Sequence, residues 1–193
     1  DLNDKCPYTP SNTNVNSQGC SVDQIPITIW NGKKVRFTKE PKSDGTLINN
    51  QDSITESLTL ARLSNRGLFN PVFENEYDTS QRDSPVNTEW AFGTLDQIYN
   101  FGSIDPEALE FKSWRDAVRA VGQTYESVGK TFVVHIIDEN IYFELTFEQW
   151  TRSNQGGGFS YIRSTPSEID DQDGDGVADD IDLCPDTPSG EIA

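Results

Sequence analysis

The sequence is poor in the residue types on which most catalytic sites depend. Its 193 residues include one histidine, three cysteines and no methionine. The histidine, His135, lies in the apolar run TFVVHII, with no serine or cysteine beside it in a nucleophile pattern. Glu144 and Glu148 are four residues apart on one strand, roughly 13 Å, which exceeds the spacing of a glycosidase carboxylate pair. We therefore interpret His135 as a packed core residue and predict no catalytic residues and no enzymatic activity.

Basic side chains are also scarce, and they are absent from the C-terminal segment. The net charge of the chain is −17. Residues 168–193 carry ten acidic side chains and no Lys or Arg, whereas residues 27–165 carry 19 acidic and 14 basic ones. Because nucleic acids and anionic lipids repel an acidic chain, we predict no nucleic-acid partner. The lack of a long apolar run predicts no membrane insertion.

The acidic residues of the C-terminal segment have the spacing of a calcium-binding loop. Oxygen ligands fall at positions 1, 3, 5, 7, 9 and 12 of DQDGDGVADDID, from Asp171, Asp173, Asp175, Val177 (its carbonyl), Asp179 and Asp182. Gly176 at position 6 permits the sharp turn that such a loop makes, and Ca²⁺ binds six to eight oxygens. We predict a Ca²⁺ site here, with a solvated acidic linker as the alternative.

The flanks of this loop exclude an EF-hand. Position 12 is Asp182 where an EF-hand has Glu, and the neighbouring SEI and LCPDTP are too short and too rich in proline for helices. The pattern DxDxDGxxDxxDxC followed by PDTPxG instead resembles the thrombospondin type 3 repeat. That resemblance implies a calcium-wrapped segment, pinned by a disulfide, with almost no hydrophobic core.

The N-terminal residues repeat part of the same motif. At a constant offset of 178, seven of the first fifteen residues are identical to residues near the C-terminus, among them Asp1, Asp4 and Cys6. Asp1 and Asp4 align with two loop aspartates, so we predict that both are also metal ligands. We expect the chain to begin inside one repeat and to stop inside the next, as one unit of a longer protein, which the absence of methionine also fits.

Three cysteines in an acidic, loop-rich chain indicate an oxidising compartment, and we predict an extracellular or cell-surface location. We expect Cys6 and Cys20 to pair, closing a loop of about fifteen residues that is worth about 3 kcal/mol. Cys184 is left over, and the repeat offset places its partner near position 198, after the last residue of this chain. A free thiol is the alternative.

Between residues 1–24 and 167–193, which we assign to the repeats, residues 25–166 predict a β-domain. Short apolar strands alternate with turn signals: a hairpin over 27–39 around Asn31-Gly32, a strand over 53–63, a hairpin of 131–137 with 141–150, and a last strand within 156–164. Alternation within 141–150 indicates a core on one side only. A Ser113 cap starts one helix that ends at Gly122. The fold class is mainly β, an antiparallel β-sandwich with the jelly roll as one candidate form and one short helix.

The phrases SPVNTEWAFGT, VGKTFVVHIIDENIYFELTF and GGGFSYIRSTP resemble a domain that recurs beside calcium repeats in secreted bacterial proteins. Two functions fit this organisation. The first is a calcium-binding structural or adhesive module, one repeating unit of a long bacterial surface or secreted protein or filament, with neighbouring repeats as partners. The second is a carbohydrate-binding module appended to a secreted polysaccharide-degrading enzyme, with a glycan as ligand. It needs exposed rings, for which the candidates are Trp90, Tyr142, Trp150 and Tyr161; core packing is the alternative for each.

Overall fold

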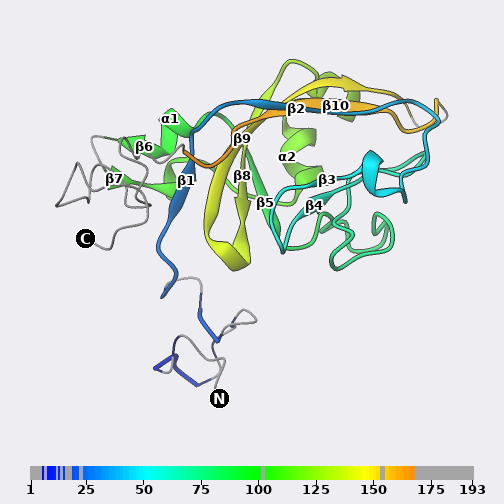
Figure 1. Cartoon of the computed structure of the whole chain (residues 1–193). Coiled ribbons are helices and arrows are strands. Elements are labelled where there is room, and N and C mark those ends of the chain that lie inside the picture. The colour runs from blue at the N-terminus through cyan, green and yellow to red at the C-terminus, as the bar shows by residue number, and fades with distance from the viewer. Residues whose placement is uncertain are drawn as a thin grey trace, which may run out of the picture.

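The computed structural model describes residues 24–100, 103–152 and 155–167, with residues 6, 8–11, 13, 15 and 19–21 near the N-terminus. Its main element is a six-stranded sheet (Figure 1) with the strand order β2-β10-β9-β8-β5. The strands are β1 (Thr28–Trp30), β2 (Val35–Lys39), β5 (Thr88–Phe92), β8 (Thr131–Ile136), β9 (Ile141–Trp150) and β10 (Phe159–Arg163). All pairings are antiparallel except that of β1, which runs parallel to the start of β9. The predicted mainly β class is confirmed.

A second layer covers one face of this sheet. It contains the small antiparallel sheet of β3 (Asp52–Ser53) and β4 (Thr59–Leu60), and the helix α2 (Trp114–Ala120). As predicted, the Ser113 side chain caps α2 by accepting a hydrogen bond from the Asp116 amide. The short 3-10 helix η2 (Ile48–Asn50) precedes β3 in the chain, and the 3-10 helix η4 (Thr124–Ser127) follows α2. The result is a β-sandwich whose second sheet is small.

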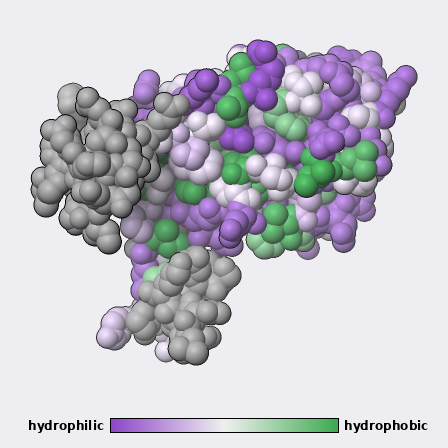
Figure 2. Space-filling view, viewed as in Figure 1, coloured by the Kyte–Doolittle hydropathy of each residue, from purple (hydrophilic) through white to green (hydrophobic). Residues whose placement is uncertain are grey.

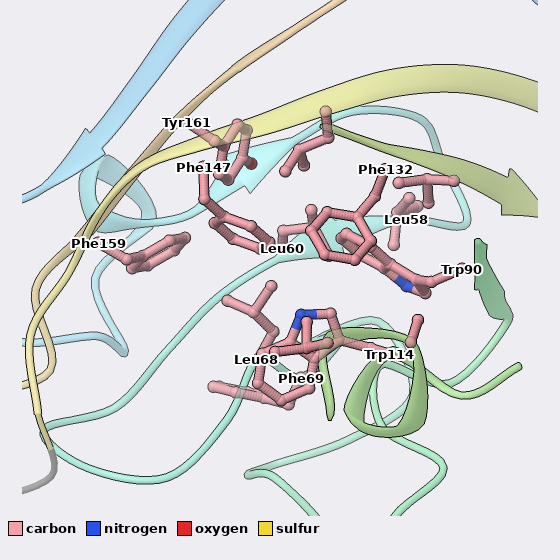
Figure 3. Packing of buried hydrophobic residues seen from close by; sticks show 14 of the residues in the cluster. Leu58, Leu60, Leu68, Phe69, Trp90, Trp114, Phe132, Phe147, Phe159 and Tyr161 are labelled. Atoms are coloured by element: carbon pink, nitrogen blue, oxygen red, sulfur yellow. The ribbon is translucent and has the colours of Figure 1, made fainter. Parts of the chain in front are cut away.

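The hydrophobic core lies between these two layers. Figure 3 shows aromatic side chains of the main sheet, among them Phe132, Phe147 and Trp90, around Leu58 and Leu60 of the second layer, with Leu68 on the far side of this cluster. The rings of Trp90 and Phe147 stack with centroids 6.3 Å apart, and both residues are fully buried. Burial of one such side chain contributes about 2–3 kcal/mol, so this aromatic layer supplies much of the stability.

The opposite face of the sheet carries a second, smaller core, which corrects the prediction that β9 buries one side only. Tyr142 and Val133 pack there against Leu95 and Ile98. The latter two belong to α1 (Leu95–Ile98), a single turn that the sequence did not single out. The chain then continues through β6 (Tyr99–Asn100), β7 (Ser103–Ile104) and the 3-10 helix η3 (Pro106–Ala108).

The hairpin predicted over residues 27–39 is wrong. β1 pairs with β9 and β2 pairs with β10, so the two strands are not partners of each other. Neither Asn31 nor Gly32 has a positive φ. Gly32 is instead needed for a close approach, because a Cβ there would lie 2.0 Å from the carbonyl oxygen of Pro166 and its amide donates to the Thr165 carbonyl. Gly32 therefore lies against the residues that directly follow β10.

The other predicted strands have mixed outcomes. The strand predicted over 53–63 is two short strands, because the Ile54 and Thr55 amides both donate to the Leu58 carbonyl and turn the chain. The hairpin of β8 and β9 is confirmed; the 3-10 helix η5 (Ile137–Glu139) and Asn140, with a left-handed φ of 52°, connect them. The last predicted strand is β10.

Near the N-terminus, Cys6 and Cys20 form the predicted disulfide, with a sequence separation of 14 residues. A disulfide is typical of proteins outside the reducing cytosol. The predicted calcium ligands Asp1, Asp4 and those between 171 and 182 lie outside the described residues, and so does Cys184. The assignment of both terminal segments to calcium repeats therefore stays a prediction.

Candidate functional site

Two of the four aromatic residues considered for ligand binding are core residues. Trp90 and Tyr161 have no exposed surface. The Trp90 indole donates to the Thr88 hydroxyl at 2.9 Å, and the Tyr161 hydroxyl donates to Asp52 at 2.7 Å. A fully buried ring cannot contact a glycan, so the ligand-binding prediction is wrong for both residues.

Tyr142 lies at a pocket of about 610 Å³ on the side of the smaller core, lined by apolar side chains together with Glu89, Glu107, His135 and Asn140. Its ring stacks on that of His135, with centroids 4.1 Å apart, and burial raises its pKa to about 12. His135 Nε2 lies 3.1 Å from the side-chain oxygen of Asn140, and Nδ1 lies 3.5 Å from Glu89. Burial lowers the pKa of His135 in spite of these two partners, which fits a neutral, packed histidine.

Trp150 lies at a different pocket, and a β-bulge brings it there. Along β10 and β9, Ser160 pairs with Gln149 but Tyr161 pairs with Phe147, so Glu148 is an extra residue in β9. The bulge reverses the alternation of side chains, and Trp150 therefore lies on the same side as Phe147.

Arginine and aromatic side chains line this second pocket, which we call the basic pocket. Its volume is about 430 Å³. Its lining consists of five arginines, four aromatic residues and a few neutral ones, namely Arg62, Arg66, Arg82, Arg115, Arg152, Tyr77, Trp114, Tyr125, Trp150, Gly67, Thr79, Gln123 and Thr124. No Asp or Glu belongs to this lining among the described residues. In a domain with a net negative charge, this is a local concentration of positive charge.

Arg62 forms the most deeply buried part of the basic pocket. It is 1% exposed, and its Cζ lies 3.8 Å from the ring centroid of Trp150. Its guanidinium donates to the backbone carbonyls of Arg66 at 3.0 Å, Gly158 at 2.8 Å and Thr151 at 2.8 Å. These bonds fix its position, but no acidic group among the described residues forms an ion pair with it. Burial lowers its pKa to about 10, so the group is charged at neutral pH.

A second buried cation adds to the field around Arg62. Lys39 has no exposed surface, and its ammonium donates to the Gly157 carbonyl at 3.2 Å. Burial, and then repulsion by Arg62, lower the pKa of Lys39, while Asp44 acts in the opposite direction. Two neighbouring buried cations are favourable only where an anion or polar groups offset their charge.

Two buried polar atoms of residues that line the basic pocket have no hydrogen-bond partner among the described residues. They are the hydroxyl of Tyr77 and the indole Nε1 of Trp114, in side chains that are 6% and 3% exposed. Leaving such a group unpaired costs about 1–3 kcal/mol. The residues are in edge-to-face contact, with centroids 6.1 Å apart, and a Cβ at Gly67 would collide with both rings. Figure 3 shows Trp114 projecting from α2 beside Phe69.

The rim of the basic pocket is exposed. Arg66, Arg82 and Arg152 are solvent-exposed, and no ion pair involves them within the described part of the chain. Arg152 lies over the ring of Tyr125, which is 40% exposed, with its Cζ 4.1 Å from the centroid. Because these side chains are exposed and form no ion pairs, they are available to contact an anion at the rim.

Other candidate sites are less complete. Glu144 and Glu148 form ion pairs with Lys34 and Arg36, at 2.9 and 2.7 Å, so they act as structural charges. The described residues contain no group of three His, Cys, Asp or Glu side chains able to hold a metal ion. None of the helices described is long and apolar enough to span a bilayer. Figure 2 shows apolar residues in small separate groups on the face in view, with no single large patch.

Sequence reasoning identified only Trp150 among the residues of the basic pocket. The pocket combines four separate segments, around residues 62–67, 77–82, 114–125 and 150–152, and no local motif links them. One signal was present: Arg62 is a charged residue within the apolar run SLTLARL. A buried charge in such a position is uncommon enough to suggest a function.

Comparison of this chain with protein-family models, with curated protein sequences and with solved structures gives no match.

Proposed function

We propose that this protein is an extracellular, non-enzymatic binding module that holds an anionic ligand in its basic pocket. One observation carries the proposal: the buried guanidinium of Arg62 has no acidic partner among the described residues, in a pocket that four further arginines line. An anion in the basic pocket would offset this charge. Charge-assisted hydrogen bonds to arginine are stronger than neutral ones, and the arginine fork suits carboxylate, sulfate or phosphate oxygens.

The flanking segments belong to the same proposal through their sequence. Their aspartate spacing supports Ca²⁺ binding, and the Cys6–Cys20 disulfide supports an oxidising environment. On this basis the module is one adhesive unit of a long surface or secreted protein or filament, with neighbouring repeats as partners. The second candidate function is a glycan-binding module appended to a polysaccharide-degrading enzyme. The aromatic residues that line the basic pocket support this function as well as the first. Both functions use the same pocket.

Thermal unfolding of the full chain with added anions tests the proposal. Sulfate, phosphate and acetate are compared with chloride at constant ionic strength. A ligand at ten times its Kd adds about 1.4 kcal/mol, and we expect this to raise the Tm by about 3–5 °C. The Arg115→Gln variant should lose the increase. Arg119→Gln is the matched control, because Arg119 lies one turn further along α2 and does not line the basic pocket.

The control separates binding from the general stabilising effect of salts such as sulfate. Equal increases in Tm for the wild type, Arg115→Gln and Arg119→Gln would show that no anion binds in the basic pocket.

A further inference from the structure

We propose that the ligand of the basic pocket is a sugar ring bearing a carboxylate, such as a uronate residue of an acidic polysaccharide. This inference rests on the proposed function and specifies its ligand. It follows from which side chains of the lining are buried and which are exposed.

The most buried polar side chains of the lining are hydrogen-bond donors. Arg62 and the indole of Trp114 donate and cannot accept, and the Tyr77 hydroxyl is able to donate. All three side chains are more than nine-tenths buried, and the last two have no partner among the described residues. A cluster of donors around a cation suits an oxyanion. Three of the five guanidinium N–H groups of Arg62 donate to backbone carbonyls, which leaves two for the oxygens of a carboxylate.

Beside the exposed arginines Arg66, Arg82 and Arg152, the rim also carries neutral polar groups that suit hydroxyls. Thr79 and Gln123 are exposed, and Thr124 is half-buried. Hydroxyl and amide groups both donate and accept, as sugar hydroxyls do. Tyr125, at the same rim, offers a partly exposed ring against which the apolar C–H face of a pyranose can be buried.

The size of the pocket supports a ligand larger than a bare anion. Its volume of about 430 Å³ lies within the range of small-molecule sites, about 300–1,000 Å³. Sulfate or acetate alone would leave the aromatic rim and the neutral groups without contacts. A carboxylated sugar places its acid on the donors and its ring at the rim.

Titration of the full chain, followed by tryptophan fluorescence and calorimetry, tests this inference. The probes are the methyl glycosides of glucuronate and galacturonate, the matching neutral glucosides and galactosides, acetate and inorganic phosphate. We expect one of the two uronosides to bind at least about tenfold more tightly than acetate. The neutral glycosides should bind at least about tenfold more weakly than that uronoside.

Variants at the rim locate the sugar ring. Tyr125→Ala should lower the affinity for the uronoside about fivefold and leave the affinity for acetate as in the wild type. Tyr99→Ala is the control, because Tyr99 is exposed and lies outside the basic pocket. It should change neither affinity.

The outcomes separate the inference from the proposed function. Equal affinities for acetate and both uronosides, or tighter binding of phosphate, would overturn the sugar acid and leave anion binding in place. If no anion binds, both the inference and the proposed function are wrong.

Discussion

The guanidinium of Arg62 lies over the indole ring of Trp150, with its Cζ 3.8 Å from the ring centroid. Arg62 follows β4, and Trp150 ends β9, so this contact joins the two layers of the sandwich. The three carbonyls that accept hydrogen bonds from Arg62 come from Arg66 in its own layer and from Thr151 and Gly158 beside the sheet. Arg62 therefore lines the basic pocket and also connects the two layers of the sandwich by its contacts.

Replacing Arg62 with methionine should destabilise the protein by about 3 kcal/mol. The change removes the hydrogen-bond donors of three backbone carbonyls. This loss is larger than the desolvation energy that is saved because methionine carries no charge. Urea unfolding measures the effect. Arg66→Gln is the control, since its side chain is exposed, and its stability should stay within about 0.5 kcal/mol of the wild type. Similar losses for both variants would argue against a structural role for Arg62.

Removal of the Tyr77 hydroxyl should not lower the stability of the folded protein, whereas removal of the Tyr161 hydroxyl should lower it. In chloride buffer, Tyr77→Phe should be as stable as the wild type or about 1 kcal/mol more stable, because this hydroxyl is buried with no partner in the described part of the chain. Tyr161→Phe should cost about 1–2 kcal/mol, because its hydroxyl bonds to Asp52 at 2.7 Å. Tyr77→Phe should also bind anions more weakly. A clear loss of stability in Tyr77→Phe would show that its hydroxyl has a partner.

Stability should fall as the pH is lowered below about 6.5, because of His135. The pKa of His135 in the folded protein is below its ordinary value of 6.5, mainly through burial, although Asn140 and Glu89 raise it. The unfolded chain therefore takes up a proton first as the pH falls, and the free energy of unfolding decreases from about pH 6.5 down to the folded-state pKa. Above pH 6.5 this contribution is constant. Glu107 lines the same pocket as His135 and Glu89, so it is the other acidic group near this histidine in the pocket.

The measurement is urea unfolding between pH 5.5 and 7.5 for the wild type and His135→Gln. His135 is the single histidine of the chain, so the variant should lack most of the slope in this range. His135→Gln should also bind anions with the affinity of the wild type, because His135 does not line the basic pocket. Identical slopes for the two proteins would assign the pH dependence to other groups.

Removal of calcium should affect the C-terminal segment and leave the β-domain folded. Residues 168–193 have ten acidic side chains to repel each other and few apolar ones to bury, so we predict that Ca²⁺ binding is what folds them. A serine protease of elastase specificity can cut after Val177 and Ala178. We expect slow cutting in millimolar Ca²⁺ and fast cutting in EDTA, with an affinity of about 10⁻⁴–10⁻³ M. Equal rates in both conditions would contradict a calcium site there.

Local sequence patterns predicted those elements that depend on neighbouring residues. The hairpin of β8 and β9 and the capped helix α2 follow from alternation and from Ser113, and both form as expected. The hairpin predicted from Asn31-Gly32 does not form, because strand pairing with distant parts of the chain outweighs the local turn preference. β1 pairs with β9 and β2 pairs with β10. A glycine in sequence does not reveal whether it serves a turn or a close approach.

The basic pocket could not be predicted for a similar reason. Simple alternation along β9 places Trp150 with Tyr142 and Glu148, away from the core. The bulge at Glu148 moves it to the core side, and a bulge depends on the pairing partner β10. Arg62, Tyr77 and Trp114 likewise meet only in the folded chain.

The indole N–H signals of the four tryptophans provide the most direct test of anion binding in the basic pocket. Trp114 and Trp150 line the pocket, whereas Trp90 donates to Thr88 inside the core and Trp30 packs against Phe143. Each signal is assigned by its loss in a Trp→Phe variant, and ¹⁵N-labelled protein is titrated with methyl glucuronoside, methyl galacturonoside and sulfate at constant ionic strength. We predict that at least one of these anions shifts the Trp114 and Trp150 signals saturably and leaves those of Trp30 and Trp90 in place. Signals of Trp114 and Trp150 that do not move with any of the three anions, or four signals that move together without saturation, would contradict an anion site in the basic pocket.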